Sequence, residues 1–214
     1  MIAASLAAEG RPNRRQHTKA DQPLATNHQT LLPMTHRIIL FRGMNTGGVR
    51  APVGEQRAMA EAMGLKNPRT LLASGNLVVE SGRATAALET DIEQEMARRF
   101  DVKIAAMVRT PPQWADLIAA NPFPQEAADQ PAKVLAMVMK EGIKAGAIEA
   151  CRALAEGGEA VEGRTLSGGD VLYFWFPHGQ GEREIFRKAT PKMLGMGTGR
   201  NWNTVLKLSE MAEV

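Results

Sequence analysis

The stretch that decides the fold is HRIILFRGMNTGG, residues 36–48. Its first six residues are mostly apolar and β-branched, which is typical of a buried strand, and the glycine-rich remainder predicts a loop. Pro52 and the apolar positions after it predict a helix, which Gly64 would end. The folded part of the chain is therefore expected to open with a strand, a loop and a helix.

The residues that follow complete a six-element unit. Residues 69–73 and 77–80 are predicted to be short strands joined by a tight turn at residues 74–76. Apolar residues recur every four positions over residues 88–96, as in an amphipathic helix. Residues 102–108 return as a strand. The order of elements is β-α-β-β-α-β.

The C-terminal half is predicted to repeat this order after a helix at residues 112–120 and a proline- and acid-rich stretch at residues 121–131. Pro191 must kink or restart the helix predicted after the second pair of middle strands, with Thr190 as its new N-cap, and Asn203 is the expected N-cap of the last helix. The elements predicted here are a strand at 133–139, a helix at 143–155, strands at 159–164 and 170–176, a helix at 182–194, a strand at 197–201 and a C-terminal helix.

Two such runs predict an α+β protein of duplicated ferredoxin-like (βαββαβ) units with antiparallel sheets, plus a C-terminal helix. Right-handed crossovers would place both helices of a unit on one face of its sheet, so that the two bare faces can cover each other. The expected division is a disordered N-terminal extension (1–33), a first domain (34–110), a helical linker or hinge (111–131) and a second domain (132–214).

The extension, residues 1–33, is polar and lacks a repeating pattern, and its short apolar run precedes its arginines, unlike a secretory signal. A start codon upstream of Met34 and a basic or organelle-targeting tail are the alternative interpretations. Without the four basic and two acidic residues of this tail, the chain has 22 basic against 21 acidic residues, so its composition does not favour nucleic-acid binding.

The sequence also bears on disulfides, cysteine-based metal sites, membrane spans and RNA stacking. Cys151 is the single cysteine, which excludes an intrachain disulfide and a cysteine-based metal site, and indicates a reducing, cytoplasmic location. No apolar run approaches the roughly 18 residues of a membrane span. Four aromatic residues at 173–176 alternate between the faces of one strand, which favours coverage on both faces by domain packing, with RNA stacking as the alternative.

Five short motifs resemble, in order and spacing, the bacterial domain-of-unknown-function family 1697 (DUF1697). They are RGMNTGG at 42–48, ASGN at 73–76, RT at 109–110, NPF at 121–123 and RNWNT at 200–204. The resemblance covers Met34 to the end of the chain, and it implies a duplicated ferredoxin-like fold and no established biochemical activity. One departure is REI at 183–185, where the family resemblance leads us to expect a Ser-Lys-Leu-like run. Glu184 stands at the position of the lysine, so a role that the lysine has in relatives is not expected in this chain.

Two motifs are candidates for ligand binding. The loop with Arg42 and Asn45 offers bare backbone N–H groups before a helix, which suits an oxyanion, although the phosphate-loop pattern is absent and the loop can equally be a simple turn. The stretch at 200–204 combines a cation, two amides, an indole and a hydroxyl, which suits a polar ligand with a planar or anionic part. Its alternative is structural, with Trp202 as a staple, Asn203 or Thr204 as a cap and Arg200 as a hydrogen-bond donor.

The leading hypothesis is a non-catalytic protein that binds a polar or anionic small ligand, or a partner, in a cleft between the two domains. An enzyme acting on a phosphorylated or carboxylated small molecule and a nucleic-acid-binding protein are the alternatives. No catalytic residue, metal, cofactor or oligomeric state is assigned. The candidate ligand-binding residues are Arg42, Asn45, Gly47, Gly48, Ser74, Asn76, Arg109, Arg200, Asn201, Trp202, Asn203 and Thr204.

Overall fold

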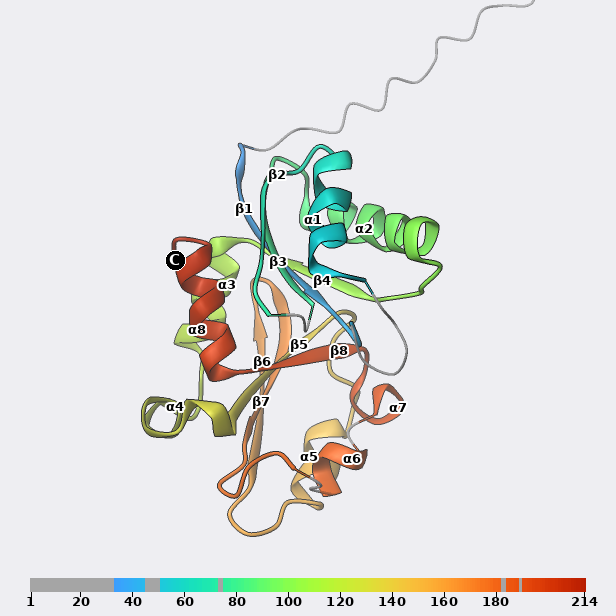
Figure 1. Ribbon diagram of the computed structural model, residues 1–214. Helices are drawn as coiled ribbons and strands as arrows, with labels where there is room; N and C mark the ends of the chain where they lie inside the picture. The colour runs from blue at the N-terminus through green and yellow to red at the C-terminus, as the bar shows by residue number, and fades with distance from the viewer. Residues whose placement is uncertain (1–32, 45–50, 73–74, 182–183, 189) are drawn as a thin grey trace, which may run out of the picture.

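The computed structural model describes residues 33–214 apart from 45–50, 73–74, 182–183 and 189 (Figure 1). The expectations for the N-terminal extension therefore lie outside the described residues. The first part contains β1 (Thr35–Phe41), α1 (Val53–Ala62), β2 (Lys66–Thr70), β3 (Asn76–Ser81), α2 (Thr85–Phe100) and β4 (Ala106–Arg109). Among the described helices, none has both the length and the apolar character needed to cross a membrane.

The second part begins with α3 (Pro111–Ala119), α4 (Pro124–Asp129) and a short 3-10 turn (Pro131–Lys133). It continues with β5 (Val134–Met139), α5 (Ala147–Arg152), β6 (Ala160–Leu166), β7 (Gly169–Trp175), α6 (Glu184–Lys188), α7 (Pro191–Leu194), β8 (Gly197–Asn201) and α8 (Trp202–Met211). The protein is thus α+β. It has two four-stranded antiparallel sheets, whose orders β2-β3-β1-β4 and β6-β7-β5-β8 correspond strand for strand.

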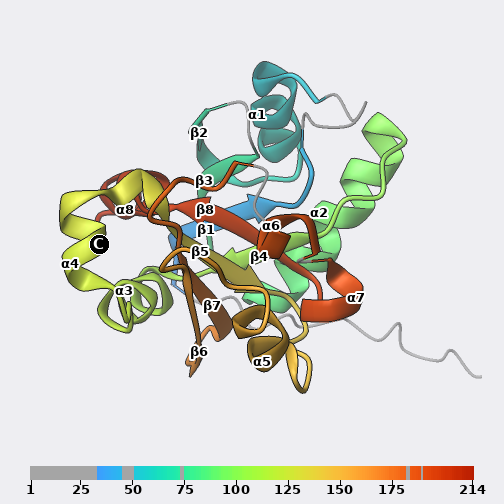
Figure 2. The ribbon, with the colours of Figure 1, turned by 90° about the horizontal axis from the view of Figure 1, so that it is seen from below.

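Each sheet is covered on both faces because its strands alternate two sets of apolar side chains. On one face of the first sheet, Ile39 and Val79 pack with residues of α1 and α2. On the opposite face, Ile38 belongs to a buried cluster that also contains Ala136 and Tyr173 of the second sheet. The two sheets therefore share a core, which α3 and α8 close at the side, as Figures 1 and 2 show.

The aromatic strand β7 confirms the expectation of coverage on both faces. Tyr173 lies in the shared core, where its hydroxyl donates to the Leu117 carbonyl at 2.7 Å, and burial raises the pKa of this phenol. Phe174 and Phe176 point to the other side, where they pack in a cluster with Cys151 of α5. The four aromatic residues therefore join two cores instead of forming an open stacking surface.

The elements β2, α5 and β4 differ in extent from the sequence prediction. Strand β2 lies three residues earlier than expected, with Pro68 inside it, Asn67 at a φ of +49°, and a register shift between Lys66 and Arg69. Helix α5 is shorter because Gly146, at a φ of +75°, stops it at its N-terminus. Strand β4 begins only at Ala106. The predicted break at Pro191 is confirmed, since α6 and α7 are separate helices.

Candidate functional site

The candidate residues of the glycine-rich loop and of the hairpin turn are described only in part. Asn45, Gly47, Gly48 and Ser74 lie outside the described residues, as does the side chain of Glu184. The flanking Arg42 is described and is half-buried at the end of β1. Its Nε donates to the Gly197 carbonyl of β8 at 3.1 Å, so it connects the first sheet to the second.

Arg200 is the most heavily engaged of the candidate residues. It pairs with Ala136 on β5, whose side chain belongs to the shared core, so the Arg200 side chain projects into the space between the sheets. It is 8% exposed. Its acceptors are Asn76 Oδ1 at 2.5 Å, Thr198 Oγ1 at 2.7 Å, and the carbonyls of Gly199 at 2.8 Å, Phe41 at 3.0 Å and Gly75 at 2.9 Å.

These acceptors account for all five N–H groups that a guanidinium offers. Three of them, Phe41, Gly75 and Asn76, belong to the first sheet and its turn, so Arg200 links β8 to that sheet. Burial lowers the pKa of Arg200 to about 10, which still leaves the side chain charged at neutral pH. The bonding pattern matches the structural alternative considered for this residue.

Arg109 has a related role at the end of β4. Its guanidinium donates to the Met139 carbonyl of β5 at 2.8 Å and to the Val108 carbonyl at 2.9 Å. Burial lowers the pKa of Arg109, and the nearby Glu89 carboxylate, at 3.6 Å, opposes this shift. Met139 and Gly197 are cross-strand partners, so Arg109 and Arg42 hold the same end of the second sheet.

Side chains form hydrogen bonds with the backbone groups on the outer edge of β4. The Arg42 amide donates to the Ala105 carbonyl at 2.9 Å, which places the backbone groups of Ala106 and Val108 on the outer edge. Their N–H groups donate to Glu93 at 2.8 Å and Glu89 at 2.7 Å. Their carbonyls accept from Lys140 at 3.1 Å and from Arg109 at 2.9 Å. This edge cannot accept another strand.

The N-cap of α8 is Asn201, which corrects the predictions of Asn203 and Thr204. The Asn201 Oδ1 accepts from the Thr204 amide at 3.0 Å and from the Thr204 hydroxyl at 2.9 Å. Asn203 is exposed, whereas Trp202 is 5% exposed and lies in the shared core. Because Trp202 must point inward at the first position of the helix, the capping position falls on the residue before it.

A cavity of about 300 Å³ lies beside this junction, and we call it the Asn201 cavity. It brings together three of the candidate residues, Arg200, Asn201 and Thr204, and excludes Arg42, Asn76, Arg109, Trp202 and Asn203. Its described lining residues are Leu72, Leu135, Met137, Gln180, Gly199, Arg200, Asn201 and Thr204.

Glycine keeps the wall of the cavity flat. A Cβ atom on Gly199 would lie 3.0 Å from Leu135 Cδ2, and both residues line the cavity. Gln180 was not predicted, because it comes from the loop after β7 and no sequence pattern marks it. Among the described residues, the side-chain NH₂ groups of Gln180 and Asn201 have no hydrogen-bond partner, so both can donate to a ligand.

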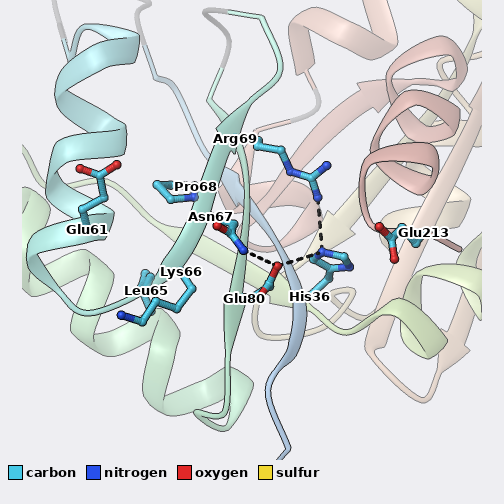
Figure 3. Close-up of a pocket in the computed structure, with 9 residues that line it drawn as sticks. All are labelled: His36, Glu61, Leu65, Lys66, Asn67, Pro68, Arg69, Glu80 and Glu213. Atoms are coloured by element: carbon cyan, nitrogen blue, oxygen red, sulfur yellow. Dashed lines mark hydrogen bonds and ion pairs between the residues drawn. The ribbon is translucent and has the colours of Figure 1, made fainter.

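A larger groove, of about 680 Å³, lies at the β2 edge of the first sheet (Figure 3). His36 Nδ1 lies 3.1 Å from the Ala212 carbonyl, which requires a proton on Nδ1. Arg69 Nη2 lies 3.3 Å from His36 Nε2 and 2.5 Å from the Met211 carbonyl. These two side chains bind the C-terminal carbonyls of α8 and hold that helix end against the first sheet. Sequence reasoning missed this contact because its partners are 142 or more residues apart.

Two further kinds of reactive group are the potential metal ligands and the single cysteine. Within the part of the chain that the structure describes, no three His, Cys, Asp or Glu side chains are placed to hold a metal ion. Cys151 is fully buried, and burial raises the pKa of its thiol to about 11. A protonated thiol in an apolar cluster is a core residue.

Comparisons with known proteins support the fold and the family. Residues 34–167 match the model of the family described as "Protein of unknown function (DUF1697)". The fold is similar to that of a conserved bacterial protein from Streptococcus pneumoniae, with a TM-score of 0.67 and 19% identity over 84% of this chain and 99% of that chain. A search of curated proteins finds no match. These comparisons give no specific function, and with the family model matching well over half of its length, the chain belongs to the DUF1697 family.

Proposed function

We propose that this protein binds a small anionic molecule, a carboxylate or a phosphate, in the Asn201 cavity, and that it acts as a binding protein without catalysis. The observation that carries the proposal is the cavity's lining, which includes Arg200 and the side-chain amides of Gln180 and Asn201, and no carboxylate among the described residues. Three larger cavities are less suited to an anion, since carboxylates line each of them: Glu61, Glu80 and Glu213 line the first, Glu93 and Glu141 the second, and Glu80 and Glu213 the third.

The lining provides two kinds of interaction with an anion. Arg200 contributes its charge through space, because its N–H groups already donate to protein acceptors. Asn201 and Gln180 contribute N–H donors. The N-terminus of α8 adds a partial positive charge at Trp202 and Asn203. The ligand is therefore held by hydrogen bonds from amides within a positive potential.

The size of the cavity limits the ligand. Pockets for small molecules range from about 300 to 1,000 Å³, and this cavity of about 300 Å³ is at the lower end. Leu135 and Met137 form an apolar wall, so the ligand combines one anionic group with a few carbon atoms. A nucleic-acid strand exceeds this volume.

Calorimetric titration with inorganic phosphate and with short-chain carboxylates tests the proposal. Asn201→Asp retains an N-cap acceptor and places a negative charge in the cavity. It should weaken anion binding by at least about tenfold, because like charges a few ångströms apart cost more than about 1.4 kcal/mol at an effective dielectric constant of about 20. Asn203→Asp makes the same charge change on the exposed side of α8 and is the matched control.

Gln180→Ala removes one donor and leaves the cap intact, so it should weaken binding without lowering the melting temperature. Wild-type protein that binds none of these anions, or equal effects of Asn201→Asp and Asn203→Asp, would refute the proposal.

We further propose that the two units are ferredoxin-like copies occupying residues 34–110 and 132–214, joined by a helical linker at 111–131. The matching strand orders of the two sheets support this. A crystal structure in which the two units fail to superpose, helices included, would contradict it. The cytoplasmic location expected for a chain whose single cysteine is reduced and buried is part of the same proposal.

A further inference from the structure

The four outer strands of the two sheets differ in how their edges are protected. Side chains satisfy the β4 edge, and the carbonyls of Gly197 and Gly199 on β8 accept from Arg42 and Arg200. Pro68 and a register shift interrupt β2. Strand β6 is less protected: among its outward backbone groups only the Gly163 carbonyl accepts a side-chain hydrogen bond within the described residues, and the strand pairs with β7 over all seven residues without a shift. Figure 2 shows β6 at the margin of the molecule, between α3 and α5. Unprotected regular edges favour pairing with another strand.

The hydrogen-bond ladder identifies the groups that point outward from β6. The Phe176 amide donates to the Lys133 carbonyl at 3.0 Å, so alternate residues of β7 face β5 and those between them face β6. Continuing the register across to β6 leaves the backbone groups of Val161, Gly163 and Thr165 directed away from the sheet. Their N–H groups have no acceptor within the described residues, and only the Gly163 carbonyl accepts a bond, from Arg164 at 2.8 Å.

We propose that β6 is a dimerisation strand, which pairs antiparallel with β6 of a second copy of this chain about a two-fold axis at Gly163. The sequence of the strand, AVEGRTL, complements itself in this arrangement. It places Ala160 opposite Leu166, Val161 opposite Thr165, Glu162 opposite Arg164, and Gly163 opposite itself. The second sheet of one copy and the second sheet of the other then form one continuous eight-stranded sheet.

The charges on β6 select this register. Because the groups of Gly163 point outward, Gly163 forms a hydrogen-bonded pair with its own copy, and Glu162 and the partner's Arg164 occupy the closer, non-hydrogen-bonded position. Opposite charges at such cross-strand positions stabilise pairing, and like charges oppose it. The symmetry produces the Glu–Arg pair twice. A register shifted by two residues loses both pairs.

The side chains involved can rearrange to make these contacts. Glu162 and Arg164 are 37% and 40% exposed, and they lie 3.4 Å apart within the chain, with Arg152 2.8 Å from Glu162. Dimerisation transfers the Gly163 carbonyl from Arg164 to the partner's amide. A Cβ on Gly163 would lie 2.6 Å from Ile148 Cδ1, so Ile148 covers the face of β6 toward which such a Cβ would point. Because side chains alternate along a strand, Glu162 and Arg164 point to the opposite face, where the charged pairs form.

Sedimentation of the full chain, at concentrations from about 1 to 200 µM, tests the proposal. Wild-type protein should form a dimer. Glu162→Arg and Arg164→Glu should each raise the dissociation constant by about tenfold or more, since each places like charges opposite one another twice. The double variant, with both residues exchanged, should restore the dimer. Thr165→Pro should also dissociate it, because this N–H points away from β7 and is used only between subunits.

Thermal unfolding at low concentration checks that each variant folds, and Lys207→Glu, on α8, is the charge-change control. A wild-type chain that sediments as a monomer over the whole range overturns the proposal. A dimer that neither single reversal weakens, or one that the double exchange does not restore, also overturns it, because the interface then lies elsewhere or has another register. This inference is independent of the Asn201 cavity.

Discussion

Replacing Arg200 by alanine separates a structural role from a ligand-binding one. The change removes the bonds that Arg200 donates to the carbonyls of Phe41, Gly75 and Gly199. The Gly75 carbonyl keeps the Phe41 amide at 2.9 Å, and the Phe41 carbonyl keeps the Thr198 hydroxyl at 3.4 Å. A hydrogen bond to a charged group contributes about 1.5–3 kcal/mol, so the three lost bonds cost more than about 3 kcal/mol. Alanine also removes the free-energy cost of burying the Arg200 charge, a cost that lowers the pKa of Arg200 to about 10, and this offsets part of the loss. We expect a net loss of about 3 kcal/mol in the free energy of unfolding.

For a chain of this length, that loss corresponds to a fall in melting temperature of roughly 6–12 °C. Urea unfolding monitored by tryptophan fluorescence measures it, and Lys207→Ala, an exposed change on α8, should alter stability by less than about 0.5 kcal/mol. Arg200→Lys should lie between wild type and alanine, because an ammonium offers three donors for five acceptors. A loss below about 1 kcal/mol for Arg200→Ala would refute the reasoning.

Three further outcomes follow from buried groups. Tyr173→Phe should cost about 1–2 kcal/mol in urea unfolding, because the Leu117 carbonyl loses its partner, and unchanged stability would contradict that bond. Glu93→Ala should cost about 2 kcal/mol and increase light scattering on heating, because the Ala106 N–H on the β4 edge is released; wild-type behaviour would show that the edge needs no such protection. The Cys151 thiol, with a pKa of about 11, should resist modification at pH 8 until the protein unfolds, and rapid labelling of folded protein would contradict its burial.

The elements with strong local signals were predicted well. Strand β8, at Gly197–Asn201, and the helix break at Pro191 have the predicted positions, because glycine and proline act through their own backbone geometry. Strand β2 was placed three residues too late, since it is an edge strand that contains Pro68. The cap of α8 was placed two residues too late, because the burial of Trp202 in the shared core determines where the helix begins.

The candidate site was predicted in part. Arg200, Asn201 and Thr204 line one cavity, as their proximity in sequence indicated. The bonding of Arg200 was beyond prediction, since its acceptor at Gly75 is 125 residues away and is a backbone carbonyl that any residue can provide. Gln180 was missed for a similar reason, because only the fold brings its loop to β8.

The measurement that most directly tests the proposed function is a titration of isotopically labelled protein with inorganic phosphate and with a short carboxylate, followed by NMR of the side-chain NH₂ groups. The account predicts saturable shifts of the Asn201 and Gln180 amide signals, which are lost in Asn201→Asp and kept in Asn203→Asp. Unmoved signals from these two amides, with shifts only among exposed lysine neighbours, would contradict it.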